Sequence, residues 1–479
     1  MVMRRENELW SWSAVDLARA IATRAISSRE AVQSSLDRIA KVNPALNAVV
    51  EVLTDEALAE ADAADAAVRS GAELGVLHGV PVTIKVNVDQ RGHATTNGVA
   101  AFRDVIAAED SPVVANFRKA GAVIVGRTNT PAFSHRWFTN NDLHGATYNP
   151  WSRRLTPGGS SGGAAVAVAS GIAPLAVATD GGGSTRIPAA CNGVVGIKQS
   201  NGVIPHSQVQ DAFGNQTYVT PTTRTVADTA LMMQAMAGED PSDPWSIGVP
   251  VPDYLDHAAP RGDLRGRRVL FCLSPPGRPV TSDVAAAFKA SLDRLASLGA
   301  ELEEFSGDGF DIEPIWRAIN HTVWRTRFDK LAADHPDDLS PTFLKQLARA
   351  ADVSGVDYQQ AMFDRTALFR RVQSLLARGD LLAMPTLTRT ALPIDQDLFG
   401  TIEIDGRSFD SVRPHWFPWT MLFNMTGHPA ISIPAGFGRD GLPIGLHLAG
   451  RFRADAELLR VAALFEAASD LLGRWPALP

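Results

Sequence analysis

The stretch TPGGSSGG (residues 156–163) places two adjacent serines between two pairs of glycines. Its composition fits a flexible linker, a phosphate-binding loop or part of a catalytic site. The apolar sequence AAVAVAS that follows predicts a buried helix, and a linker seldom runs straight into one. A phosphate-binding loop of the Walker type requires a lysine after its last glycine, and none follows here. Ser160 and Ser161 are therefore candidate catalytic serines.

The same stretch also matches the Gly-x-Ser-x-Gly motif of the α/β-hydrolase nucleophile elbow, through Gly158–Gly162. That motif requires a strand before the serine and a helix after it. Prolines at positions 150 and 157 make the preceding residues a poor strand. An esterase of this class would need an essential histidine and could dispense with Lys85.

Outward from this stretch, helical patterns alternate with short apolar strands. The expected helices include two within 13–42, the second with a capping box from Ser27 to Glu30, and others at about 55–71, 284–297 and 455–468. The expected strands include 79–89, 121–126, 174–179 and 429–437. This alternation predicts an α/β fold around a buried mixed sheet. We expect a single domain over 1–479, with an N-terminal helical segment (1–70) and a peripheral, mostly helical region (about 240–380) that shapes a pocket.

The bulk composition is that of a globular protein without specialised tracts. The 479 residues carry a net charge of −7, which gives no indication of nucleic-acid binding. Only two cysteines occur, far apart in sequence, so neither a disulfide framework nor a cysteine metal site is expected. The N-terminus lacks the apolar core of a signal peptide, and no apolar run is long enough to span a membrane. We therefore expect a cytoplasmic protein that binds neither nucleic acid nor membrane.

Lys85 is unusual because it lies within the alternating segment GVPVTIKVNVD. Val82 and Ile84 fall on one face of the expected strand, and Thr83 and Lys85 on the other. A lysine at a strand edge could point to solvent or pair with Asp89. Alternatively, a desolvated lysine would have a pKa below its usual value of about 10.4 and could act as a base.

A second glycine-serine motif follows at residues 178–190, ATDGGGSTRIPAA. An apolar strand runs into Asp180, three glycines and Ser184. Consecutive glycines let backbone amides turn toward one point without hindrance from Cβ atoms. Amides that converge beside a serine hydroxyl are what an oxyanion hole requires, although a tight turn between a strand and a helix is the alternative.

Together, Lys85, GGSSGG and DGGGSTRIP, in that order, resemble the amidase signature family. Further blocks of similarity run along nearly the whole chain, from ISSREAVQSSLDRIAKVNPALNAVV to FNMTGHPAISIPAGFGRDGLPIGLHLAG. The resemblance implies a central mixed β-sheet covered by helices on both faces. It also implies hydrolysis of carboxylic amides by a serine, a cis-serine and a lysine, without a metal or other cofactor.

Carried over residue by residue, the resemblance makes Ser184 the nucleophile and Lys85 the base. Ser160 relays protons between them and follows a cis peptide bond with Gly159, while Ser161 is a structural neighbour. The amides of Gly181, Gly182, Gly183 and Ser184 form the oxyanion hole. Arg186 braces this loop, in our interpretation through Asp180.

The sequence departs from the family pattern at several positions. Gly181 stands where a threonine is usual, and Thr185 where a small hydrophobic residue is usual. Arg127 takes the place of a common lysine, and Ala132 that of an acidic or amide residue. Because Ala132, Phe133 and Ser134 lie on a loop that often faces the acyl pocket in this family, they are candidate pocket residues.

The substrate is expected to be an apolar or aryl amide, because aromatic residues crowd the motifs. The candidate pocket aromatics are Phe133, Trp137, Phe138, Tyr148, Phe213, Trp316, Trp324, Trp416, Phe417 and Trp419. A carbamate (urethane) or an ester is chemically close to such an amide. The alternatives are a subunit of a tRNA-dependent amidotransferase that acts as a glutaminase in a complex, the esterase described above, and an inactive binding protein. The resemblance also allows a homodimer.

Overall fold

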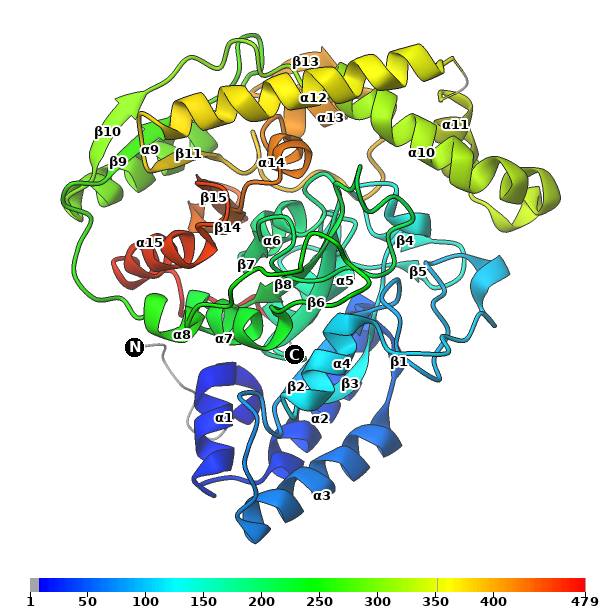
Figure 1. The fold of residues 1–479 in the computed structure, drawn as a ribbon, viewed down its shortest axis with the longest axis vertical. Helices are drawn as coiled ribbons and strands as arrows, with labels where there is room; N and C mark the ends of the chain where they lie inside the picture. Colours follow the sequence, from blue (N-terminus) through cyan, green and yellow to red (C-terminus); the bar gives the residue numbers. More distant parts are fainter. Residues whose placement is uncertain (1–7, 351, 479) are drawn as a thin grey trace.

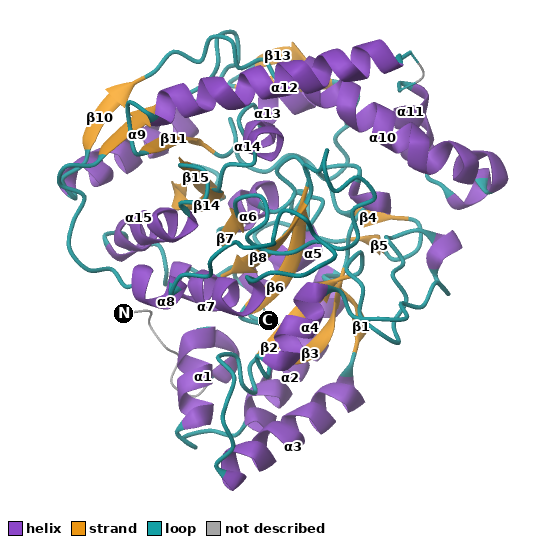
Figure 2. Ribbon diagram, viewed as in Figure 1, coloured by secondary structure: helices purple, strands orange, loops and turns teal. Residues whose placement is uncertain are grey.

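One mixed sheet of eleven strands runs through the computed structural model, which describes residues 8–350 and 352–478. Figure 2 shows most of the strands in the interior, with helices around them. In spatial order the strands are β1 (Val49–Val52), β3 (Val123–Thr128), β2 (Pro81–Lys85), β6 (Leu175–Asp180), β8 (Tyr218–Thr223), β7 (Val195–Lys198), β14 (Ala430–Phe437), β15 (Pro443–Gly450), β11 (Leu381–Pro385), β9 (Arg268–Phe271) and β10 (Glu301–Glu304). The predicted α/β fold is confirmed. Residues 1–7, part of the stretch assessed above for a signal peptide, lie outside the described residues.

The position of β2 in the sheet explains where Lys85 and the second glycine-serine motif meet. Strand β2 pairs in parallel with β3 on one side and with β6 on the other. Lys85 is the last residue of β2 and Asp180 the last residue of β6. Because the carboxyl ends of parallel strands lie at the same edge of a sheet, the lysine and the glycine-serine loop after β6 meet there.

Helices cover both faces of the sheet, as predicted. They are α1 (Ala14–Ala22), α2 (Ser28–Leu46), α3 (Thr54–Ser70), α4 (Pro112–Lys119), α5 (Gly162–Ala169), α6 (Arg186–Asn192), α7 (Val226–Met236), α8 (Tyr254–His257), α9 (Ser282–Ser297), α10 (Glu313–Asp334), α11 (Pro341–Ala348), α12 (Gly355–Leu376), α13 (Val412–Trp416), α14 (Thr420–Thr426) and α15 (Asp455–Ala467). Two short hairpins lie outside the sheet, β4 (Asn140–Asn141) with β5 (Gly145–Ala146), and β12 (Thr401–Ile404) with β13 (Arg407–Asp410). Figure 1 shows α1–α3 at one end of the molecule and α10–α12 at the other.

The two faces of the sheet bury different sets of side chains. Val82, Ile84 and Val177 face a core that includes residues of α1, α4, α7, α9 and α15. The opposite side of β6 carries Ala176 and Ala178, which pack against α5. These two residues are small, so α5 approaches the sheet closely. Each fully buried Val or Ile contributes roughly 1.5–3 kcal/mol through the hydrophobic effect.

Most predicted elements are present, with two differences. The helices expected within 13–42 are α1 and α2, and the capping box between Ser27 and Glu30 is formed. The expected strand over 79–89 ends earlier, at Lys85, and a turn follows it. The region 240–380 is mostly helical, but it also contributes β9 and β10 to one end of the central sheet.

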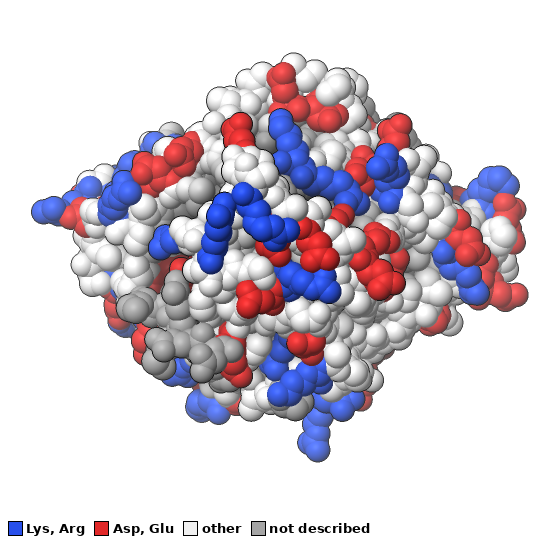
Figure 3. All heavy atoms as spheres, turned by 90° about the horizontal axis from the view of Figure 1, so that it is seen from below, with Lys and Arg blue, Asp and Glu red and all other residues white. Residues whose placement is uncertain are grey.

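The surface carries a mixture of charges. Basic and acidic side chains are interspersed over the face shown in Figure 3, without a large area of one sign. None of the helices formed by residues 8–350 and 352–478 combines the length and the apolar composition needed to cross a bilayer.

Candidate active site

The stretch 156–163 is buried along its whole length, which excludes a flexible linker. No strand segment occurs between residues 147 and 161 apart from a single bridge at Leu155, so the strand that a nucleophile elbow requires is absent. The peptide bond between Gly159 and Ser160 is cis, as the resemblance implies. A side chain at position 159 would bring its Cβ within 2.7 Å of the Phe138 backbone nitrogen, so only glycine fits there.

The amine of Lys85 is enclosed by three hydroxyl groups. Its Nζ lies 2.8 Å from Ser160 Oγ, 2.9 Å from Ser161 Oγ and 2.9 Å from Thr179 Oγ1. The Lys85 side chain has no solvent exposure. The structure therefore brings the lysine and the stretch 156–163 together, and it excludes the interpretation of Lys85 as a solvent-facing edge residue. Asp89 instead accepts a hydrogen bond from Thr95.

Burial lowers the pKa of Lys85 well below its ordinary value. The charged ammonium form loses its hydration in the protein interior, and this loss outweighs the opposing attraction of the Asp180 carboxylate. The enclosing groups are neutral hydroxyls that hydrogen-bond either form of the amine. The surroundings thus favour the neutral form of the amine more than water does.

The loop after β6 carries Ser184 into a cavity that Ser160 also lines. Ser184 is partly exposed, and among the residues that the structure describes its hydroxyl has no hydrogen-bond partner. The two glycine-serine segments are joined directly, because the Ser161 amide donates to the Ser184 carbonyl at 3.0 Å. The Ser161 hydroxyl donates to the Thr179 carbonyl at 3.0 Å, which fits the structural role expected of it.

The glycines of this loop differ in what their amides and carbonyls contact. The Gly183 amide donates to Asp180 Oδ1 at 2.6 Å, so this one of the four predicted oxyanion donors is already engaged. The Gly182 carbonyl accepts from Thr420 Oγ1 at 2.8 Å, and the Gly181 carbonyl from Trp316 Nε1 at 3.4 Å. Gly183 has φ +118°, and a Cβ there would lie 2.4 Å from Thr420 Oγ1, so no other residue fits.

A buried ion pair braces the loop, as interpreted from the sequence. Arg186 Nε and Nη2 each donate to the Asp180 carboxylate at 3.0 Å, and both side chains are inaccessible to solvent. The pKa of Asp180 is lowered, because the Arg186 charge and hydrogen bonds from Arg186, Asn424 and Gly183 together outweigh the effect of burial. The remaining Arg186 hydrogen atoms point to the Thr420 carbonyl, Asn424 Oδ1 and His447 Nε2.

Two departures from the family pattern are accommodated by neighbouring threonines. A Cβ at Gly181 would lie 3.0 Å from Thr217 Cγ2, so Thr217 occupies space beside this position. The hydroxyl of Thr185 shares a hydrogen bond of 2.5 Å with that of Thr220. A third departure, Arg127, donates to the carbonyls of Val88 and Ala94 and so holds the segment that follows β2.

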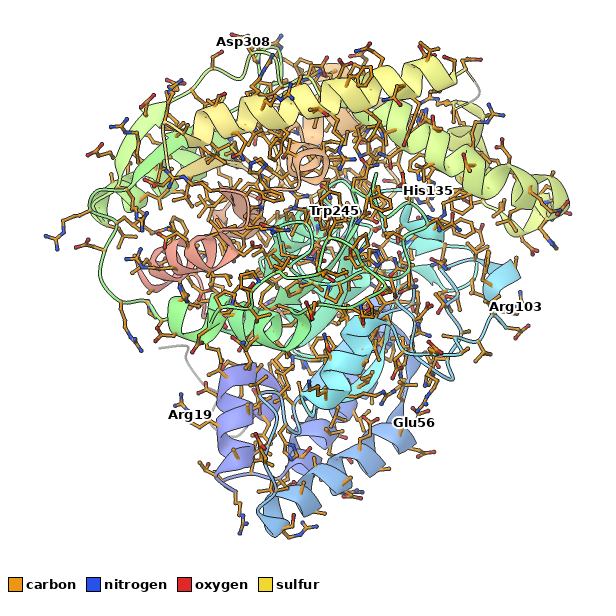
Figure 4. All side chains as sticks on the ribbon, viewed as in Figure 1. Arg19, Glu56, Arg103, His135, Trp245 and Asp308 are labelled. Carbon is orange, nitrogen blue, oxygen red and sulfur yellow. The ribbon has the colours of Figure 1, made fainter. Side chains whose placement is uncertain are left out.

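The cavity has a volume of about 570 Å³ and is lined by several aromatic side chains. Of the candidate aromatics named from the sequence, those that line it are Phe133, Trp137, Trp316, Trp324 and Phe417. Ser134 lines it as well. Figure 4 labels His135, another lining residue, near α10, where its ring lies 6.4 Å from that of Trp324.

Other candidate pocket residues lie elsewhere. Ala132 is buried in a cluster with Val99, Phe328 and Phe343, and it does not line the cavity. The reason is local, because Phe133 and Ser134 both have positive φ and the chain turns sharply there. Phe138, Trp416 and Trp419 are buried in a core, Phe213 is 79% exposed, and Tyr148 stacks with Arg153.

Sequence reasoning missed several cavity residues that come from distant segments. They include Asn87, His206, Gln208, Arg327, Tyr358, Arg413 and Met421. Asn87 donates to Thr179 Oγ1, the same oxygen that contacts Lys85. Its position two residues after Lys85 is the one available signal in the sequence. The others carry no local pattern.

Comparisons with known proteins agree with this geometry. A family model described as Amidase matches residues 30–459. The chain is 36% identical over 477 residues to the acylamidase of Rhodococcus erythropolis, with 99% of each protein covered. It is 37% identical over 485 residues to the indoleacetamide hydrolase of Bradyrhizobium diazoefficiens, which covers 97% of this chain and 88% of that protein. A solved bacterial aryl acylamidase of the amidase signature family superposes with a TM-score of 0.89 and 31% identity, over 97% of this chain and 99% of that one.

The chain therefore belongs to the amidase signature family. It is an enzyme that hydrolyses amide bonds. The family, fold class and amide hydrolysis expected from the order of the motifs are confirmed, and an α/β-hydrolase esterase and an inactive binding protein are excluded.

Proposed function

We propose that Ser184 is the nucleophile, Ser160 the proton relay and Lys85 the base of this amide hydrolase. The observation that carries the proposal is the buried amine of Lys85, which lies 2.8 Å from Ser160 Oγ at the floor of a cavity that Ser184 also lines. A serine hydroxyl attacks an amide only when a base takes up its proton. Lys85 suits this task because burial favours its neutral form.

Counting hydrogen atoms supports the direction of proton flow. A neutral amine has two hydrogens and one lone pair, so it donates to two of its three hydroxyl neighbours and accepts from the third. The Ser161 hydroxyl is committed to the Thr179 carbonyl, and Thr179 Oγ1 also receives a hydrogen bond from Asn87. Ser160 and Thr179 both line the cavity, but among the described residues the Ser160 hydroxyl has no hydrogen-bond partner other than Lys85, so it is the neighbour that can pass its proton to Lys85.

The reaction then proceeds through an acyl-enzyme. Ser184 Oγ bonds to the substrate carbonyl carbon while its proton moves to Ser160 and the Ser160 proton to Lys85. The C–N bond breaks when the same relay returns a proton to the leaving amine. Water repeats the sequence against the acyl-Ser184 ester, releasing a carboxylic acid and the free serine.

The negative charge on the tetrahedral oxygen requires converging donors. We assign these to the amides of Gly181, Gly182 and Ser184, because the Gly183 amide is engaged by Asp180. The Thr420 hydroxyl and the Trp316 indole hold two carbonyls of this loop from the outside. Such preorganised donors are worth about 2.7–4 kcal/mol each at the transition state.

We propose apolar or aryl amides as substrates, with carbamates and esters as further substrates of the same machinery. The aromatic lining of the cavity supports this class, since Trp316 and Trp324 form an edge-to-face pair 5.7 Å apart beside the reaction centre. We further propose that the chain acts alone or as a homodimer in the cytoplasm, rather than as a glutaminase subunit of a larger complex.

The test is hydrolysis of a panel of anilides, aliphatic amides, carbamates and esters by the purified single chain. Ser184→Ala and Lys85→Ala should each lower kcat/KM by about 10⁴-fold or more. Ser170→Ala is the control, because Ser170 is a serine as buried as Lys85 but lies just after the far end of α5. Mass spectrometry of a trapped acyl-enzyme should place the acyl group on Ser184. Acylation of Ser160 or Ser161, or full activity without Lys85, would overturn the assignment.

A further inference from the structure

One face of α10 lines the cavity from the reaction centre to its mouth. Trp316, Ile319, Val323 and Arg327 follow one another at helical spacing, and all four line the cavity. Trp316 contacts the Gly181 carbonyl, so it marks the reacting end. This face is buried at Trp316 and Ile319, which are 7% and 1% exposed, partly exposed at Val323 and exposed at Arg327. From the rise of the helix, the cavity extends roughly 16 Å between Trp316, at the reaction centre, and Arg327.

Three arginines line this cavity, and they differ in the groups that interact with their guanidinium charges. Arg413 forms an ion pair with Glu313 and lies 4.3 Å from the Trp316 ring centroid. Arg136 donates to the Asn140 carbonyl, and Asp142 acts on its charge. Arg327 has neither a hydrogen bond nor an ion pair with any residue in 8–350 or 352–478. Its guanidinium carbon lies 5.0 Å from the ring centroid of the adjacent Phe328.

The surroundings of Arg327 would favour an incoming anion. Although the side chain is accessible at the mouth, enough protein surrounds the guanidinium that burial lowers its pKa. His206 lies close enough for the Arg327 charge to act on it, and burial lowers its pKa to about 4. His206 is thus neutral near pH 7 and can donate a hydrogen bond. The acidic lining residue Asp211 acts on Tyr358 and Arg365 rather than on Arg327.

We propose that Arg327 binds a carboxylate at the far end of the substrate, which makes it a specificity-determining residue. The substrate class is then an extended amide, apolar next to the scissile bond and acidic at its distal end. This inference rests on the proposed function, because it takes Ser184 as the reacting end of the channel. The interaction is a charge-assisted hydrogen bond whose strength is reduced by solvent at the cavity mouth.

The experiment compares matched substrates that differ in one charge. Mono-anilides of dicarboxylic acids of increasing chain length place the carboxylate on the acyl side, and acylated amino-aryl acids place it on the amine side. Each is paired with its methyl ester. In one of the two series we expect a preference for the acid at low salt. At the optimum chain length, amide hydrolysis of the free acid should have a kcat/KM about tenfold above that of its methyl ester. We expect about 1 M salt to narrow that difference.

Arg327→Gln should remove the preference while leaving kcat/KM of the neutral esters within about twofold, and Arg327→Lys should retain part of it. Arg325→Gln is the matched control, because Arg325 lies on the same helix, pairs with Asp329 and does not line the cavity. A wild-type enzyme that treats acid and ester alike in both series would overturn the inference, as would an Arg327→Gln variant that loses activity on both equally. Either result would leave the proposed function standing, whereas inactivity toward every amide would contradict the proposed function itself.

Discussion

The ion pair between Asp180 and Arg186 offers the sharpest test of how the active-site loop is held. Asp180→Asn keeps the shape of the side chain but removes its charge. In the structure the Asp180 carboxylate accepts from Gly183, Thr185, Arg186 and Asn424. It is also the one acidic group that forms an ion pair with Arg186 among residues 8–350 and 352–478.

The expected loss of stability follows from the burial of Arg186. Because its side chain has no solvent exposure, removing the carboxylate leaves a buried guanidinium without a counter-charge. Breaking a buried pair in this way costs about 3–5 kcal/mol. That is a large part of the roughly 5–15 kcal/mol by which a typical domain is stable. Replacing both partners, as in Asp180→Leu with Arg186→Met, removes both buried charges and should recover part of the loss.

Urea denaturation measures the effect, with the denaturation midpoint as the readout and the slope as a check that the unfolded state is unchanged. Hydrolysis of an anilide, measured in parallel, should also fall, since asparagine has one acceptor oxygen and therefore leaves either the Gly183 or the Thr185 amide without its acceptor. A loss of unfolding free energy below about 1 kcal/mol for Asp180→Asn, taken as the midpoint shift multiplied by the slope, would refute the reasoning. So would losses for Asp180→Leu and Arg186→Met, each measured alone, that simply add in the double variant.

Two further predictions concern pH. The value of kcat/KM should rise with pH as the Lys85 ammonium loses its proton, and this rise should be complete well below the usual lysine pKa of about 10.4, because burial lowers the pKa of Lys85. A pH–rate profile with its ascending limb at the ordinary lysine value would contradict this assignment. Stability should fall as pH rises between about 5 and 8, because burial raises the pKa of Asp228 to about 7 and that of Glu466 to about 8, so the unfolded chain releases these protons first. Glu466→Gln should flatten the slope of melting temperature against pH, and an unchanged slope would show that this carboxyl is not its source.

The parts of the site that were predictable from the sequence lie in short contiguous motifs. Lys85 is conspicuous because a lysine interrupts an apolar strand, and the glycines around Ser160 and Ser184 mark places where the backbone must pass close to other groups. The ion pair between Asp180 and Arg186 was also predictable from the sequence, because the two residues lie six positions apart within one short motif. The start of α2 after its cap at Ser27 was predicted, whereas its end at Leu46 lies four residues beyond the predicted range.

The parts that escaped prediction depend on contacts between distant segments. Nothing near β9 and β10 indicates that they extend the same sheet as β2, because pairing is decided by neighbours far along the chain. Ala132 was misplaced because positive φ at Phe133 and Ser134 turns the chain in a way that those residue types do not favour. Arg327 was missed because an unpaired arginine looks like any surface arginine until the cavity is seen.

The position of β14 and β15 has a consequence for the newly made protein. These late strands fill the sheet between β7 and β11, and the neighbouring α14 supplies Thr420, which holds the Gly182 carbonyl across 238 residues of sequence. A ribosome adds about 5–20 residues per second, so Ser184 is synthesised at least ten seconds or so before its loop can be secured. We expect the emerging chain to carry every proposed catalytic group and yet remain inert until translation has passed this helix.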